Sequence, residues 1–271
     1  MATVLTDMGR KVTTRLRPAA LGGLVLLAAG ALLRPLEAPA WRGLAHAQPV
    51  LDRRSLDAAA GQGIVLGLLG GFRAVVADML WLRANADWED ADLPATYTAL
   101  RLVTTVDPRP IGFWLNGARV IGYDMPGWRI AAAGGGDAVP AVVQRRIDEE
   151  QARLALAHLE WALEFHPRHP LIYVEMANLH LHRRADLSRA AAFYKLAAQQ
   201  PGAPRFAARI HAELLQQLGR DREAYVWLVA LHPTLPADEP VARADVVLAR
   251  IRVLEAKLAV PEAERFQPSS P

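Results

Sequence analysis

A set of small and large apolar residues recurs along the middle of this 271-residue chain. The first copy is Ala155, Leu159, Ala162 and Pro167, and the second copy is Ala190, Tyr194, Ala197 and Pro201. The alanines are shifted by 35 residues and the prolines by 34. A period near 34, with apolar residues at helical offsets and Pro as the terminator, is typical of stacked helical hairpins. The sequence therefore predicts an all-α solenoid, an architecture suited to binding other proteins.

Apolar periodicity and the Pro and Gly positions predict which segments are helical. The predicted helices span residues 61–82, 93–106, 111–123, 145–165, 171–182, 187–199, 205–218, 222–231 and 241–258. Together they form a repeat domain over residues 61–258. Residues 124–140, with Pro126 and three consecutive glycines, are predicted to be a loop inserted in this domain. Its Trp128 is either a cap over the core or a contact for a partner. Residues 259–271, with several Pro and Ser residues, are predicted to be a disordered tail.

The predicted hairpins resemble the tetratricopeptide repeat (TPR) family over about residues 70–235. In that family, the first helix of each hairpin contains an aromatic residue followed by a small one. The second helix contains Ala, a large apolar residue, a second Ala and a closing Pro. The central unit contains Tyr173, Ala177, Ala190, Tyr194 and Ala197, with one extra residue in its turn. The next contains Ala212, Gly219, Ala224 and Leu228, and an earlier one contains Trp114, Asn116 and Ala118 before its second helix at 155–167. Residues 72–86 with 96–108 resemble a degenerate unit.

The resemblance implies a right-handed superhelix whose concave face, formed by the first helices, binds peptides or protein segments. By position in the repeat, Leu171, Val174, Asn178 and Leu181 are implied to face this groove. Asn178 is a candidate to hydrogen-bond a ligand backbone, and the alternative is a solvated Asn on a face without a ligand. The implied partners are proteins.

The N-terminal part of the chain differs in charge from the rest. Residues 1–54 carry eight basic and three acidic side chains, so the remaining residues are slightly acidic although the whole chain has a net charge of +3. A nucleic-acid-binding protein needs a concentrated basic surface on its folded part, and the sequence shows none. We therefore expect no nucleic-acid partner.

Residues 1–17 form a basic flank, and an apolar segment follows at 18–34. As a helix, its uncharged part spans about 24 Å, slightly less than a hydrocarbon core of about 30 Å. The positive-inside rule then predicts a single-pass protein of the bacterial inner membrane, with the basic flank in the cytoplasm and the repeat domain on the extracytoplasmic side. The alternative is a signal peptide cleaved after Ala40 or Ala47.

Residues 35–60 contain three prolines and are predicted to be a linker. Beyond it, Gly63, Gly67 and Gly71 stand four residues apart, which places them on one face of a helix. Such a face lets another backbone approach closely, so we expect a helix-packing surface there.

The sequence offers no residues for catalysis, a cofactor or a metal ion. It has no cysteine, no nucleophile elbow and no phosphate or dinucleotide loop. The histidines His166, His169, His180 and His182 do not have the spacing of a zinc site, and capping or solvated roles are the simpler interpretation. We expect a protein that is not an enzyme.

Together, these features predict a membrane-anchored scaffold or adaptor in a bacterial envelope complex, such as pilus, secretion or envelope-biogenesis machinery. Its partner would be a membrane-associated protein. The alternative hypothesis is a cleaved, secreted or periplasmic repeat protein that binds a small ligand or a glycan between its helices.

Overall fold

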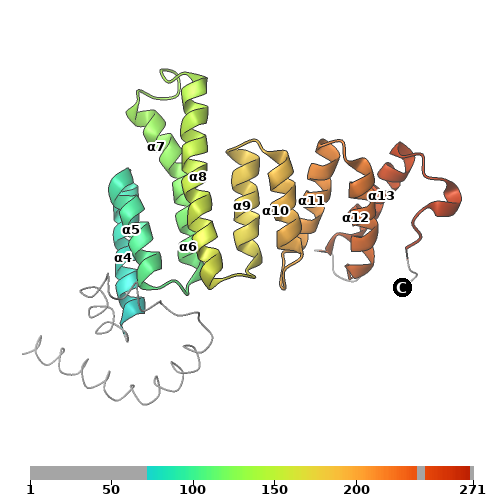
Figure 1. Cartoon of the computed structure of the whole chain (residues 1–271), viewed down its shortest axis with the longest axis horizontal. Helices are drawn as coiled ribbons and strands as arrows, with labels where there is room; N and C mark the ends of the chain where they lie inside the picture. The colour runs from blue at the N-terminus through green and yellow to red at the C-terminus, as the bar shows by residue number, and fades with distance from the viewer. Residues whose placement is uncertain (1–71, 237–241, 269–271) are drawn as a thin grey trace, which may run out of the picture. The chain divides into compact units, whose positions relative to one another are not determined.

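The computed structural model describes residues 72–236 and 242–268 of the chain. The chain divides into two compact units, Met1–Arg73 and Ala74–Pro271, and all the described residues but 72 and 73 belong to the second. Over the described residues every regular element is helical and no strand occurs, which confirms the predicted all-α class (Figure 1).

Most helix boundaries lie within about four residues of the predicted ones, but the first predicted helix, 61–82, is wrong at its end, because the observed helix continues to Glu89. The α-helices are α4 (Arg73–Glu89), α5 (Leu93–Val106), α6 (Ile111–Arg119), α7 (Met125–Ala132), α8 (Ala141–Phe165), α9 (Pro170–His182), α10 (Leu187–Ala198), α11 (Arg205–Gln217), α12 (Asp221–Leu231) and α13 (Ala244–Lys257). A π-helix, η1 (Val120–Asp124), joins α6 to α7, and short 3₁₀ turns occupy η2 (His232–Thr234) and η4 (Glu262–Glu264).

Local sequence explains several of these boundaries. Asp92 caps α5 by accepting a hydrogen bond from the Ala95 N–H at 3.0 Å, and Asp186 caps α10 in the same way. α11 ends where Gly219 adopts a φ of +72°, a left-handed conformation that glycine tolerates without steric cost.

The repeated residues lie where helices pack together. Ala155, Ala162, Ala190 and Ala197 are all fully buried, as is Leu159. Small side chains at these positions let helix axes come close, and the large apolar residue between each pair of alanines fills the space beside the crossing. The apolar residues that recur in the sequence are therefore core residues.

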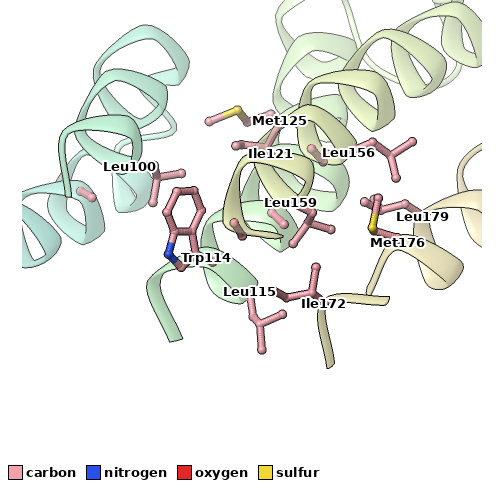
Figure 2. Packing of buried hydrophobic residues seen from close by; sticks show 14 of the residues in the cluster. Leu100, Trp114, Leu115, Ile121, Met125, Leu156, Leu159, Ile172, Met176 and Leu179 are labelled. Carbon is pink, nitrogen blue, oxygen red and sulfur yellow. The ribbon is translucent and has the colours of Figure 1, made fainter. Parts of the chain in front are cut away.

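The apolar core is divided into three clusters along the chain. The first cluster joins α4–α6, η1, α7, α8 and α9 around Trp114 and Leu159 (Figure 2). The second cluster joins α9, α10 and α11, and the third cluster joins α11, α12 and α13. Consecutive helices from α9 to α13 pack against each other in chain order, as Figure 1 shows.

The predicted loop at 124–140 is wrong over its first half. Residues 125–132 form α7, which continues α6 through the π-helix η1. The Met125 N–H bonds to the Val120 carbonyl five residues earlier, and Pro126 has no N–H to contribute to the next turn. The wide turn thus accommodates a proline inside a helix. The true connection is 133–140, where Gly134 and Gly135 have positive φ angles.

The predicted disordered tail at 259–271 is also wrong for residues 259–268. These residues have defined positions, and Phe266 packs against the third cluster. Residues 269–271 lie outside the described part of the chain.

The predicted localisation, a single pass through the bacterial inner membrane, is corrected by the structure. None of the helices in residues 72–236 and 242–268 is both long enough and apolar enough to cross a membrane. The longest of them, α8, has charged residues distributed over its 25 residues. The segments on which the prediction rested all lie outside the described residues: the flank 1–17, the apolar segment 18–34, the linker 35–60, and the predicted packing face of Gly63, Gly67 and Gly71.

Candidate partner-binding surface

The residues that were implied to face the groove differ in how far they are exposed. Leu171 is 40% exposed at the start of α9, whereas Val174 is only 7% exposed and belongs to the second cluster. Leu181 is half-buried and packs against that same cluster. Trp128, on α7, is half-buried against the first cluster and so acts mainly as a cover for the core. Val174 is therefore a core residue, and its burial leaves little of its side chain for the predicted contact with a partner.

A second exposed apolar side chain occupies the position equivalent to Leu171. Phe206 follows 35 residues later, which is the shift between the repeated alanines. Each of the two residues is the second residue of its helix, α9 and α11, and their exposed fractions are 40% and 39%. The sequence analysis missed Phe206, although applying the alanine shift to Leu171 would have found it. We call Leu171 and Phe206, with the hollow beside Leu171, the first-helix surface.

The hollow has a volume of about 660 Å³ and lies between two turns of the chain. One wall is residues 166–171, which comprise the connection from α8 to α9 and the first two residues of α9. The opposite wall is Pro201, Gly202 and Pro204, which connect α10 to α11. Pro167 and Pro170 lie in the first wall, so both walls contain two prolines. Because proline fixes its own φ angle, both walls hold their shape without a ligand.

Arg168 brings a guanidinium group to the hollow, which two histidines, His166 and His169, also line. The pKa of His169 is lowered by burial and by the neighbouring His166, so His169 is neutral at pH 7. The His166 Nε2 atom lies 2.9 Å from the Pro108 carbonyl oxygen and ties the turn to the α5–α6 connection. The buried Nδ1 atom of His169 has no hydrogen-bond partner. The hollow therefore combines apolar walls with one guanidinium group and a neutral imidazole.

Polar side chains tie α9 to its neighbours further along the helix. The Tyr194 hydroxyl of α10 donates to the Asn178 side-chain oxygen at 2.5 Å. The side-chain oxygen of Asn178 is thus occupied by this hydrogen bond. Its side-chain NH₂ group remains the donor that it can offer to a ligand. The Arg119 guanidinium of α6 donates to the buried Glu175 carboxylate at 3.1 Å. These contacts hold α6, α9 and α10 in a fixed relation.

The other histidines considered in the sequence analysis have separate environments. His180 is buried and stacks on Phe193, with ring centroids 5.2 Å apart, while His182 lies at the end of α9. In the described part of the chain, no group of three or more His, Cys, Asp or Glu side chains is placed to hold a metal ion. A further histidine, His158, is 6% exposed and packs on Trp114 in the first cluster. Burial, with a contribution from Arg101, lowers the pKa of His158 to about 4, so it is a neutral core residue.

Comparison of the sequence with protein-family models finds no match, and comparison with curated proteins finds none either.

Proposed function

We propose that this protein is a scaffold of TPR-like helical hairpins, arranged as a solenoid, that binds a segment of a partner protein on its first-helix surface. The observation that carries the proposal is the repetition of one exposed apolar residue at equivalent positions, Leu171 and Phe206. A side chain that is needed only for the core of its own hairpin would be buried in both copies. Two exposed copies in the same helical position offer anchor points to one elongated ligand.

The hollow beside Leu171 supports a protein segment as the ligand. Its prolines give it a fixed shape, so a ligand side chain that enters it does not have to order the walls. Arg168 in the same lining can pair with a carboxylate of the ligand. The Asn178 amide, further along α9, can donate to a ligand backbone carbonyl. A short stretch of polypeptide supplies an apolar side chain, a carboxylate and a carbonyl together.

Selection of peptides from a random 12-residue library, first on the full chain, tests this proposal. Affinities of the selected peptides are then measured for the double variant Leu171→Ser/Phe206→Ser. Its matched control is Leu196→Ser/Val226→Ser, which removes two exposed apolar residues from the second helices α10 and α12. Burial of one large apolar side chain is worth about 1.5–3 kcal/mol, so losing both contacts weakens binding at least about tenfold.

We expect this loss for the Leu171/Phe206 variant and wild-type affinity for the control. If the two double variants lost the same amount of peptide affinity, the binding surface would lie elsewhere. The same conclusion would follow if the peptides bound both variants as tightly as the wild type.

A further inference from the structure

The last described residues of the chain fold back onto its final helices. After α13 ends at Lys257, Ala259 adopts a left-handed φ of +51° and the Val260 N–H bonds to the Glu255 carbonyl at 2.9 Å. This reversal directs residues 261–268, which we call the C-terminal strap, back along the protein. Within the strap, η4 is followed by extended backbone at Arg265.

One aromatic side chain anchors the strap. Phe266 packs against the third cluster, which Leu228, Ile251 and Leu254 help to form. Its ring meets the His232 ring edge-on, with centroids 5.2 Å apart and planes at 69°. The residues on either side of it, Arg265 and Gln267, are exposed. The apolar contact of the strap is thus concentrated in Phe266.

A buried carboxylate receives the strap backbone at the same place. Glu255 of α13 is 2% exposed, and its Oε1 atom accepts a hydrogen bond from the Phe266 N–H at 2.7 Å. The Tyr225 hydroxyl lies 3.5 Å from the same oxygen, and the Arg252 guanidinium donates to Oε2 at 2.8 Å.

Glu255 is charged at neutral pH. Burial by itself raises its pKa, but the hydrogen bonds from Arg252 and from the Phe266 N–H outweigh that effect and keep the pKa below its ordinary value. Arg265 of the strap adds a second favourable positive charge. The site is therefore an anionic hydrogen-bond acceptor beside an apolar surface.

This arrangement has the parts of a peptide-recognition site. A fixed acceptor on the protein takes a backbone N–H, and an apolar surface takes the adjoining aromatic ring. Arg265, whose Nε atom donates to the Val260 carbonyl at 3.3 Å, adds a favourable positive charge near the carboxylate. The strap is short and held mainly at one residue, so a competing segment has few contacts to displace. The exposed strap residues on both sides of Phe266 leave room for a ligand chain to enter and leave.

We propose that the surface formed by Tyr225, His232 and Glu255 is a peptide-binding site, separate from the first-helix surface. Phe266 occupies it in the free protein. Its ligand is an extended segment of a partner protein in which a basic residue precedes a phenylalanine. The strap is then an intramolecular competitor, and a partner binds only after displacing it.

A labelled peptide with the strap sequence, Pro-Glu-Ala-Glu-Arg-Phe-Gln-Pro, tests the proposal by fluorescence anisotropy against the full chain. In the variant Phe266→Ala the site is vacated, and we expect saturable binding at least tenfold tighter than to the wild type. The matched control Gln267→Ala changes an exposed neighbour in the strap and should bind as weakly as the wild type. A peptide with Ala in place of Phe should not bind, and Glu255→Gln combined with Phe266→Ala should lose at least tenfold in affinity.

Circular dichroism establishes that each variant is folded. If Phe266→Ala does not fold, Phe266→Leu retains an apolar side chain with a poorer fit, and peptide affinity between those of the wild type and a vacated site is expected. A folded Phe266→Ala variant that does not bind the peptide would overturn the proposal. So would a wild-type protein that forms concentration-dependent dimers lost on Phe266→Ala, because the strap would then serve a second copy of the chain.

Discussion

Gly122 offers the sharpest test of how the central helices pack. It lies in the π-helix η1, where α8 and α9 both approach it. A Cβ atom at this position would stand 2.5 Å from Leu179 Cδ2 and 3.3 Å from Ala155 Cβ. Carbon atoms in contact are normally about 3.5–4.0 Å apart, so the first distance is a clash of about 1 Å. Both neighbours are fully buried, so the leucine methyl can yield only by repacking against other core atoms.

The change Gly122→Ala should therefore destabilise the protein, although alanine is the better helix former. Overpacking of a core costs about 1–3 kcal/mol, and replacing a helical glycine by alanine returns about 0.5–1 kcal/mol. With a clash this short, we expect a net loss of about 2 kcal/mol in the free energy of unfolding.

Gly127 provides the matched control on the same continuous helical stretch. A Cβ atom there meets nothing within 4 Å, so Gly127→Ala should stabilise the protein by about 0.5–1 kcal/mol. Urea unfolding followed by circular dichroism at 222 nm measures both variants. The truncation Leu179→Ala opens the space, so in its presence Gly122→Ala should cost much less. Equal stability of the two glycine variants would refute the close approach of η1 to α9.

Two further predictions concern buried polar groups. His158 has an ordinary pKa of 6.5 when unfolded and about 4 when folded, because of burial and Arg101. The unfolded chain thus binds the proton more tightly, and stability that is complete above pH 6.5 should fall by about 2 kcal/mol between pH 8 and pH 5. Burial also lowers the pKa values of His169, His180 and His211, so His158→Phe should remove about this much of the pH dependence in urea unfolding and leave their part. An unchanged slope would contradict a buried neutral imidazole. Tyr194→Phe deletes the hydroxyl that donates to Asn178 and should cost about 1 kcal/mol in thermal unfolding, whereas Tyr173→Phe, which loses an exposed contact to the Pro167 carbonyl, should cost less.

The helices and the central core were predictable because they depend on local sequence signals and on side-chain size. Small apolar residues at helical spacing marked positions on the buried face of each helix, and Ala162 and Ala197 are both fully buried. Helix ends were similarly marked, as by Asp107-Pro108 after α5, since proline disfavours helix in the residue before it. Leu171, which its position in the repeat implied for the groove, is exposed in the first turn of α9, and its contact with a partner stays a prediction.

α7 was missed because local sequence preferences oppose a helix there, and packing against α8 and η1 supports it. Pro126 and Gly127 are helix breakers by local rules, and no sequence pattern announces the π-helix that accommodates them. α8 is 25 residues long, about 37 Å, while α9–α13 have 11 to 14 residues each. The first half of α8 extends beyond the hairpin length and packs against α7 (Figure 1). Because the first half of α8 extends beyond the hairpin, its apolar side chains need another helix to pack against. The length of α8 was therefore the one signal that could have indicated α7.

The errors at the candidate sites have different physical origins. Val174 was assigned to a ligand by its position in a repeat, but neighbours from α10 and α11 bury it, and their arrangement is not readable from one repeat unit. The C-terminal strap was assigned to disorder from its Pro and Ser content. Amino-acid composition is an average over many residues. The strap is held by one residue, Phe266, whose ring packs on the third cluster and whose backbone N–H donates to Glu255.

The division of the core into three clusters makes the two proposed sites separable by mutation. Leu171 lies at the start of α9, a helix that contributes to the second cluster. Phe266 packs on the third cluster. The two clusters share only the helix α11. When each helix packs on its neighbours in the chain, the loss of a contact weakens the adjoining hairpins and leaves distant ones intact. Phe266→Ala should therefore spare peptide binding at Leu171, and Leu171→Ser should spare the strap. Mutual loss would mean that the described helices unfold as one unit, and each affinity measurement would then report stability instead of recognition.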